Sequence, residues 1–267
     1  MTEDMKACKD ILSLSWPRLE TVTLTSTEST NTWLRQRREQ MLGHTCLVIA
    51  DEQTAGRGSG TNHWESAPGE NLTFSLQVCP TALPANRMFA LSQVMALGVA
   101  QGLEHALGIQ DGEGKSGVSI KWPNDVYYHD GKVCGMLIEN DLCARRVELS
   151  VMGVGINVNQ TLFVSDAPNP LSLKQIAGHD FRRSEVLSEV LACTRFCYEM
   201  MEHGAYDSLH DLYLTRLYRK GEWHQFTDQG GTFDGMIRGV QPDGHLIVQG
   251  HAGGERKYAF GEIKYII

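Results

Sequence analysis

The sequence predicts a mixed α+β domain followed by a small β-rich unit. Helix-like and strand-like segments are interspersed up to about residue 220. After Glu222 the pattern changes to short alternating strands with turn signals such as PDG, and no helical period is present. The 267 residues suffice for one large domain with a small appendage. We therefore predict one domain over 1–220 and a second over 221–267.

The first domain is predicted to begin with a helix, two strands and a longer helix. Residues 29–43 (STNTWLRQRREQMLG) start with helix-capping residue types and end on glycine, which indicates a helix. Residues 45–53 are short and β-rich, as expected of a buried strand. Residues 71–78 (NLTFSLQV) alternate apolar and polar side chains like a half-buried strand. Apolar residues at three- and four-residue spacing predict a long helix over 86–108.

The rest of this domain is predicted to be strands followed by helices. Over 118–140 we expect a strand, a proline break, a second strand, a turn and a third strand, with Asp130-Gly131 as a type I′ hairpin turn. The glycines of a further strand, 145–159, indicate close approach of another group to its backbone. Amphipathic helices are expected at 183–204 and 205–221.

Composition indicates a cytoplasmic enzyme. The net charge of −8 disfavours non-specific binding to nucleic acid, because phosphates repel an acidic protein. The longest apolar runs, CLVIA and MALGVA, are far too short to span a bilayer, and the N-terminus does not resemble a signal peptide. The seven cysteines are scattered without a C-x-x-C pair, which favours reduced thiols over a disulfide scaffold or a zinc site.

The common nucleotide and nucleophile motifs are incomplete in this chain. GRGSGT has Thr61 where a dinucleotide fingerprint needs its third glycine, and a strand rather than a helix follows. GEGKS lacks the first glycine of a P-loop, and no G-x-S-x-G is present. Cys193 and Cys197 lie one helical turn apart, and we interpret them as core residues without a nearby histidine. Any nucleotide site must therefore be built differently.

Two unusual segments remain, QTAGRGSGTNHW (53–64) and KWPNDVYYHDGKVCG (121–135). The first is either a flexible loop or a backbone cradle for an anion. In the second, proline, asparagine and aspartate are costly inside a sheet, so the segment is either an edge bulge or a rigid corner that presents Asn124 and Asp125 to a ligand. Strand alternation can return Lys132 to the same face.

These segments resemble the biotin–protein ligase family. KWPND, a lysine seven residues after the aspartate, and then GMLIE match the pattern of that family in order. ESTN (28–31), QTAGRG with its following tryptophan, and GVGINVN (153–159) resemble three further family segments. The resemblance covers most of the chain. It implies a biotin/lipoate ligase-like core with a mixed sheet, similar to class II synthetases, and a C-terminal SH3-like barrel.

The resemblance implies a two-step reaction that uses ATP, Mg²⁺ and biotin. Biotin and ATP give biotinyl-5′-AMP, and a lysine of a biotin carboxyl carrier domain then attacks this mixed anhydride. Lys132, Arg57 and Asp125 are the implied catalytic residues, and no protein ligand for a metal is identified. The implied biotin-binding residues are Ser29, Thr30, Asn31, Gln53, Gly56, Arg57, Gly58, Ser59, Lys132 and Gly135. The implied ATP-binding and adenylate-binding residues are Arg57, Trp64, Trp122, Asn124, Asp125 and Asn157. The amides of Gly56 and Gly58 are expected to assist as an anion nest.

Plainer interpretations stay open for several of these residues. Ser29 and its neighbours could only cap a helix, the two tryptophans could be core residues, and Asp125 could only brace a turn. Ser59 stands where many family members have a second arginine, so we expect weaker retention of the adenylate.

The rival functions are a lipoate–protein ligase or octanoyltransferase, and a non-catalytic biotin- or carrier-binding regulator. About 20 residues precede the catalytic pattern, so no DNA-binding domain is expected; a homodimer through a sheet edge is compatible with this fold.

Overall fold

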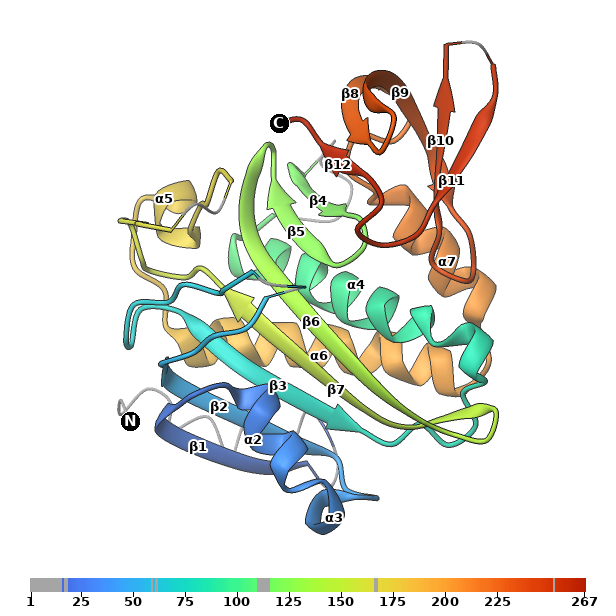
Figure 1. Ribbon diagram of the computed structural model, residues 1–267. Helices are drawn as coiled ribbons and strands as arrows, with labels where there is room; N and C mark the ends of the chain where they lie inside the picture. Colours follow the sequence, from blue (N-terminus) through green and yellow to red (C-terminus); the bar gives the residue numbers. More distant parts are fainter. Residues whose placement is uncertain are drawn as a thin grey trace.

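The computed structural model describes residues 16, 19–58, 60, 62–109, 116–165, 168–251 and 253–267. These residues form a seven-stranded sheet and a five-stranded sheet, with helices packed mainly on the larger one (Figure 1). The predicted α+β class with a mixed sheet and a C-terminal β-unit is confirmed.

The large sheet is mixed because only its first two strands are parallel. Its order is β1-β2-β3-β7-β6-β5-β4, with β1 parallel to β2 and every other neighbouring pair antiparallel. The strands are β1 (Glu20–Thr27), β2 (Cys46–Gln53), β3 (Leu72–Val78), β4 (Val118–Lys121), β5 (Asp125–Tyr128), β6 (Gly131–Cys143) and β7 (Arg146–Ile156).

Two short elements were not predicted. β1 is an edge strand rich in threonine and serine, in which only Val22 and Leu24 alternate with polar residues, and its pattern of exposure is irregular. α5 (Leu173–Ala177) is a single short helix. Its start carries a capping box in which Ser172 and Gln175 bond reciprocally, a signal that the sequence does contain.

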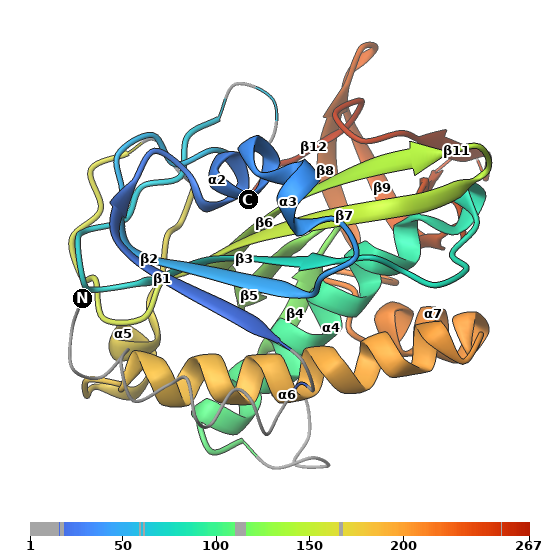
Figure 2. The same cartoon turned by 90° about the horizontal axis from the view of Figure 1, so that it is seen from below.

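Two long helices cover one face of the large sheet (Figure 2). They are α4 (Phe89–Ala106) and α6 (Arg183–Glu202), and a 3₁₀ turn (Ala85–Arg87) precedes the first. A Cβ at Gly98 would lie 2.5 Å from the Thr194 Cα, so glycine permits the close approach of the two helices. Among the described residues, no helix is both long and apolar enough to cross a membrane.

The opposite face of the sheet carries α2 (Thr30–Gln36) and α3 (Arg38–Met41). The single helix predicted over 29–43 is therefore interrupted, at Arg37, whose backbone is not helical. α2 packs on β2, β3 and β7. As a result β3 is buried on both faces rather than half-buried as predicted. Its alternation survives, since its polar residues Thr73, Ser75 and Gln77 all lie beneath the α2 side.

The predicted strand–turn–strand segment after β4 is present, but its turn is shifted. β5 ends at Tyr128 and β6 begins at Gly131, so His129 and Asp130 occupy the turn. The residue with positive φ is His129, at 49°, whereas Gly131 has no positive φ. The predicted type I′ turn at Asp130-Gly131 is wrong, because the strands pair one residue out of that register.

The C-terminal residues form the five-stranded antiparallel sheet in the order β11-β10-β9-β8-β12. α7 (Tyr206–Thr215) leads into it and ends six residues before the predicted limit at Gly221. The strands are β8 (Trp223–Asp228), β9 (Gly231–Val240), β10 (Leu246–Gly250), β11 (Glu255–Tyr258) and β12 (Lys264–Tyr265). This sheet is consistent with an SH3-like unit, although no pairing between β11 and β12 closes it into a barrel among the described strands.

The two sheets share one contiguous hydrophobic cluster, which includes Phe226 and Ile237 of the small sheet. The Trp122 Nε1 donates to the Gly244 carbonyl at 2.8 Å, and the Tyr213 hydroxyl donates to the Pro123 carbonyl at 3.0 Å. The small sheet thus lies firmly against the corner between β4 and β5. The division at 220/221 stays a prediction.

Candidate active site

The main pocket, with a volume of about 410 Å³, opens on the α2 side of the large sheet. β6 and β7 form its floor. Residues 29–31 and the glycine loop, which we define as residues 53–64, form one wall. The corner between β4 and β5 and residues 260–265 of the small sheet form the other. Segments from both predicted domains therefore meet around one cavity.

Most of the residues implied by the sequence line this pocket. They are Ser29, Thr30, Asn31, Gln53, Arg57, Gly58, Trp64, Trp122, Asn124, Asp125, Lys132 and Gly135. Gly56 lies just behind the wall, where a Cβ would be 2.5 Å from the Trp64 carbonyl oxygen. Ser59 lies outside the described residues.

A buried polar network occupies the end of the pocket nearest β3. The Ser75 Oγ lies 2.7 Å from the Thr30 Oγ1 and 2.6 Å from the Asn31 Oδ1. The Gln53 Oε1 accepts from the Thr30 amide at 2.8 Å. Ser29 makes no side-chain cap hydrogen bond, so the interpretation of its hydroxyl as a helix cap is wrong. This network fixes the orientation of several amide and hydroxyl groups beside the cavity.

Glycines form the floor because side chains from above occupy the space that a Cβ would need. A Cβ at Gly153 would lie 2.2 Å from the Asn31 Oδ1. At Gly155 it would lie 2.2 Å from the Trp64 Cε2, and at Gly135 3.0 Å from the Trp64 Cζ3. The close approach predicted from the glycines of this strand is thereby confirmed, and the indole of Trp64 lies flat against β6 and β7.

The glycine loop folds back on itself. The Gly58 amide donates to the Asn62 carbonyl at 2.8 Å, and the Trp64 amide donates to the Gly56 carbonyl at 3.0 Å. The Gly58 amide is therefore occupied by a carbonyl in this structure, and the anion nest stays a prediction.

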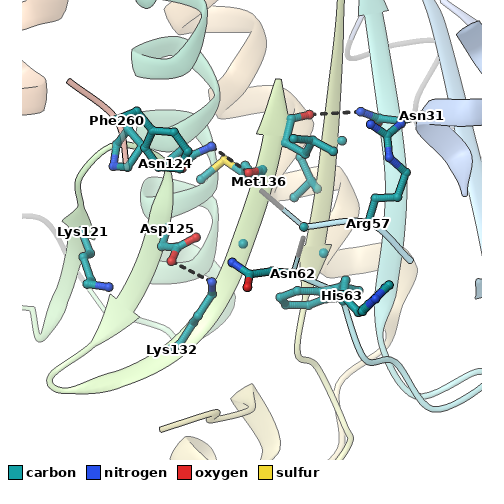
Figure 3. A pocket seen from close by; sticks show the side chains of 18 of the residues that line it. Asn31, Arg57, Asn62, His63, Lys121, Asn124, Asp125, Lys132, Met136 and Phe260 are labelled. Atoms are coloured by element: carbon teal, nitrogen blue, oxygen red, sulfur yellow. Dashed lines mark hydrogen bonds and ion pairs between the residues drawn. The ribbon is translucent and has the colours of Figure 1, made fainter. Parts of the chain in front are cut away.

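Arg57 does not lie beside Lys132. Its Nη2 pairs with the Glu139 Oε1 at 3.0 Å, and the Glu139 Oε2 also accepts from the Asn31 Nδ2 at 2.8 Å. Figure 3 shows the Arg57 side chain directed toward the Asn31 end of the pocket. Glu139 is a site residue that sequence reasoning missed, although it ends the GMLIE motif.

Lys132 and Asp125 form the central ion pair of the pocket. The Lys132 Nζ lies 2.7 Å from the Asp125 Oδ2, and their side chains are 22% and 23% exposed. Figure 3 shows this contact, which is accompanied by a register shift between Val126 and Tyr127 in the pairing of β5 with β6. Asn124 instead braces the corner, since its Nδ2 donates to the Met136 carbonyl at 2.7 Å. Asp125 thus has a charged side-chain partner, and its catalytic role stays a prediction.

The residues implied for ATP are divided between two cavities. Asn157 lines a second pocket of about 470 Å³ together with Trp64 and Lys132. Its Nδ2 lies 3.3 Å from the carbonyl oxygens of Lys132 and Leu171. Trp122 lies at the far end of the first pocket, where its ring packs on Phe260. The core interpretation of Trp122 therefore has support, because the ring joins the two sheets.

Sequence reasoning also missed Lys121 and the small-sheet residues that line the pocket. Lys121 was visible as the first residue of KWPND, but nothing in the sequence brings residues 260–265 to this wall. One further expectation is wrong, because the Cys193 Sγ lies 3.7 Å from the His105 Nδ1. Both cysteines of that pair are buried in the core, as predicted.

Comparison with known proteins gives a consistent picture. Residues 23–157 match the model of the biotin/lipoate A/B protein ligase family. The chain is 33% identical to the bifunctional ligase/repressor BirA of Bacillus subtilis over 80% of this chain and 64% of that protein. It is 30% identical to a biotin--[acetyl-CoA-carboxylase] ligase of Paracoccus denitrificans over 86% of this chain and 94% of that protein. The chain therefore spans less than two thirds of the bifunctional relative.

A solved structure is similar to this chain over most of its length. The biotin protein ligase from Aquifex aeolicus, in complex with biotin and ATP, superposes with a TM-score of 0.75 at 26% identity. The match covers 92% of this chain and 99% of that one. The similarity therefore extends beyond the residues of the family model, through the C-terminal sheet.

Proposed function

Because the chain belongs to the biotin/lipoate A/B protein ligase family, we propose that it is a biotin–protein ligase. It joins the carboxyl group of biotin to a lysine of a biotin carboxyl carrier domain at the expense of ATP. The observation that carries this proposal is a single pocket in which the Lys132–Asp125 pair faces the same glycine floor as the Thr30–Gln53 network.

The polar network suits the ureido ring of biotin. That ring carries one carbonyl acceptor and two N–H donors, which need fixed partners when they are buried. Ser29, Thr30, Asn31 and Gln53 supply hydroxyl and amide groups at one end of the pocket. The glycine floor leaves room for the body of the ligand to lie close to the sheet.

In the first step, a carboxylate oxygen of biotin attacks the α-phosphorus of ATP, the bond from this phosphorus to the oxygen bridging to the β-phosphate breaks, and pyrophosphate leaves with the electron pair. Two anions must meet, so positive charge is needed where they do. Lys132 lines the main pocket and also the second cavity, whose residues Asn157 and Trp64 we assign to the adenosine. Arg57 joins the phosphate only after it leaves Glu139, so its contribution depends on a movement of the glycine loop.

In the second step, the ε-amine of the carrier lysine attacks the acyl carbon of biotinyl-5′-AMP. The C–N bond forms, the C–O bond to phosphate breaks, and AMP leaves with the electron pair. The attacking nitrogen must lose a proton, and Asp125 is the carboxylate that lines the pocket among the described residues. Asp125 therefore orients the amine and accepts its proton, while Lys132 stabilises the leaving phosphate.

The residues present fit a Mg²⁺ ion that arrives with the nucleotide. No group of three His, Cys, Asp or Glu side chains in the described part of the chain is placed to hold a metal. Protein-bound Mg²⁺ commonly uses one or two carboxylates together with substrate phosphates and water. Asp125 is the carboxylate within the pocket, and the ion would neutralise phosphate charge.

The experiment that tests the function is mass spectrometry of a biotin carboxyl carrier domain incubated with the protein, biotin and Mg-ATP. We expect the carrier to gain one biotinyl group, and to gain none when its acceptor lysine is replaced by arginine. A parallel reaction with lipoate separates biotin ligation from lipoate ligation. No modification with biotin would overturn the proposal, and modification with lipoate alone would assign the rival activity.

The role of Lys132 is tested by biotin-dependent exchange between ATP and pyrophosphate. Lys132→Ala should lower the exchange rate at least about a hundredfold, as does removal of one preorganised transition-state donor in other enzymes. Lys174→Ala is the matched control, because this lysine pairs with Asp180 outside both pockets. Exchange at the rate of the unmodified protein in Lys132→Ala would exclude the assignment.

The proposal also includes the acceptor protein, the cellular location and the interaction partners. The carrier domain is expected to belong to a biotin-dependent carboxylase, as the name of the Paracoccus relative suggests for that protein. The scattered cysteines support a cytoplasmic location. The acidic net charge supports the expectation of no DNA binding, and size-exclusion chromatography with light scattering would test for a homodimer.

A further inference from the structure

The main pocket is rich in positive charge although the chain carries a net charge of −8. Among the described residues that line it, Arg57, Lys121, Lys132 and Lys264 are cationic and only Asp125 is a carboxylate. A pocket of this kind in an acidic protein attracts an anion with several charges.

Only two of these four cations are neutralised in the structure. Lys132 is paired with Asp125 of the same hairpin, and Arg57 of the glycine loop is paired with Glu139 of β6. Lys121 and Lys264, in contrast, make no ion pair with any residue in the described ranges. These two come from different sheets, β4 and β12, line the same pocket, and are brought together because Lys121 contacts the ring of Tyr265, the neighbour of Lys264.

Lys121 is held in place by aromatic rings rather than by a carboxylate. Its Nζ lies 5.2 Å from the centroid of the Tyr127 ring and 4.9 Å from that of Tyr265. Figure 3 shows Lys121 and Lys132 on either side of Asp125. Burial lowers the pKa of Lys121, and the nearby Asp125 carboxylate only partly opposes that shift. The charged ammonium is therefore costly in this structure, and a bound anion would offset that cost.

The order of the strands places this unpaired charge opposite the polar network. From β3, which carries Ser75, the sheet continues through β7, β6 and β5 to β4, which carries Lys121. Four strand spacings amount to about 19 Å. The Lys132–Asp125 pair lies between these two ends, on β6 and β5.

Phosphoryl and nucleotidyl transfers place the attacking and leaving oxygens roughly in line. This argument rests on the proposed function, in which biotin enters from the β3 end and its carboxylate attacks the α-phosphorus near Lys132. The new P–O bond forms on the β3 side and the bond between the α- and β-phosphates breaks. The leaving pyrophosphate then takes the electron pair and departs toward β4.

We propose that Lys121 and Lys264 bind the β- and γ-phosphates of ATP and the pyrophosphate that leaves. The small sheet then contributes directly to the first step, through Lys264 and through the Tyr265 ring that positions Lys121. Lys121 is the stronger contact, because it is half-buried, whereas Lys264 is exposed.

The experiment compares the two half-reactions in Lys121→Met, Lys264→Met and the matched control Lys257→Met. Lys257 lies on the same small sheet, pairs with Asp243 and does not line the pocket. In biotin-dependent exchange we expect the KM values for pyrophosphate and ATP to rise about ten- to hundredfold in Lys121→Met, as for loss of one charge-assisted contact. The rise should be several-fold in Lys264→Met and absent in the control.

The second half-reaction starts from preformed biotinyl-5′-AMP and a carrier domain, and therefore contains no β- or γ-phosphate. Both lysine variants should transfer biotin at the rate of the unmodified protein. Binding of biotin alone, measured by calorimetry, should also be unchanged. Lys121→Met should melt at or above the temperature of the unmodified protein, because the substitution removes a charge that burial disfavours.

Each outcome has one interpretation. Unchanged KM values for pyrophosphate in Lys121→Met would overturn the proposal. Normal exchange together with slow transfer from biotinyl-5′-AMP would also overturn it, and would assign the two lysines to an acidic face of the carrier. Failure of the unmodified protein to catalyse any exchange would instead contradict the proposed function.

Discussion

The substitution Gly155→Ala tests whether Trp64 closes the active-site pocket by lying on a bare strand. A Cβ at this position would lie 2.2 Å from the Trp64 Cε2 and 2.5 Å from its Nε1. The indole would have to retreat by at least about 1.2 Å to reach the 3.4 Å at which ordinary contact begins. It has little room elsewhere, because its ring also touches Gly135 and its backbone is held by Gly56.

Overpacking of this kind costs about 1–3 kcal/mol. Trp64 is only half-buried and lies at the end of the glycine loop, so the loop should yield while the sheet stays intact. We therefore expect biotin affinity to fall about five- to 150-fold, at 1.36 kcal/mol per tenfold change, with little change in the free energy of unfolding.

Calorimetry with biotin and urea denaturation measure these two quantities. Gly250→Ala is the matched control, because a Cβ there meets nothing within 4 Å. The decisive measurement is a double-mutant cycle with Trp64→Ala, in which the penalty of Gly155→Ala should largely disappear. If the two substitutions are additive, the contact between Trp64 and Gly155 does not control binding and the reasoning is refuted.

Three other substitutions test separate contacts. Glu139→Gln frees Arg57 from a partly exposed ion pair, so a non-hydrolysable adenylate analogue should bind up to about fivefold more tightly; weaker binding by calorimetry would contradict this. Arg183→Met leaves the half-buried Asp51 carboxylate without this partner and should lower the free energy of unfolding in urea by about 1.5–3 kcal/mol at pH 7. Burial alone would raise the pKa of Asp51, but the hydrogen bond and charge of Arg183 lower it. The stabilisation by this ion pair is therefore present above about pH 4 and is lost as the pH falls further. If Arg183→Met lowered the free energy of unfolding equally at pH 7 and pH 3, this prediction would be contradicted. Ser59→Arg should slow dissociation of biotinyl-5′-AMP about ten- to 100-fold in stopped-flow measurements, and an unchanged rate would show that the missing arginine is not what limits retention.

Local sequence patterns predict the elements that bury one apolar stripe or one alternating face. The period of α4 and α6 and the apolar run of β2 are of this type, and each was located within a few residues. The edge strand β1 was missed because its alternation is short, with only Val22 and Leu24 as apolar residues between threonines and serines. The burial of β3 on both faces could not be inferred, because it depends on α2 returning over the sheet from an earlier part of the chain.

In the active site as well, local contacts can be predicted from the sequence and long-range contacts cannot. Residues within one motif, such as Lys132 and Asp125, meet because a single hairpin carries both, and their separation of seven residues already indicates this. Contacts between motifs are invisible in the sequence. Glu139 reaches Arg57 across 82 positions, and Tyr265 reaches Lys121 across more than half of the chain, so neither contact leaves a local signal.

These contacts also explain how an active site for two anions can exist before either one binds. Arg57 and Lys132, the two cations assigned to the reacting groups, are each held by a carboxylate, which lowers the repulsion between like charges and fixes both side chains. Substrate binding is then an exchange of one anion for another, and the net gain is smaller than a phosphate contact alone would provide. Lys121 has no such partner to give up, so its full attraction is available to the incoming nucleotide. An uneven distribution of paired and unpaired cations would thus draw the triphosphate toward β4 before Arg57 exchanges Glu139 for a phosphate. This order of events can be checked by measuring the rates of ATP binding in the two variants separately. Lys121→Met should lower the association rate constant of ATP, whereas Glu139→Gln should change only its dissociation rate constant.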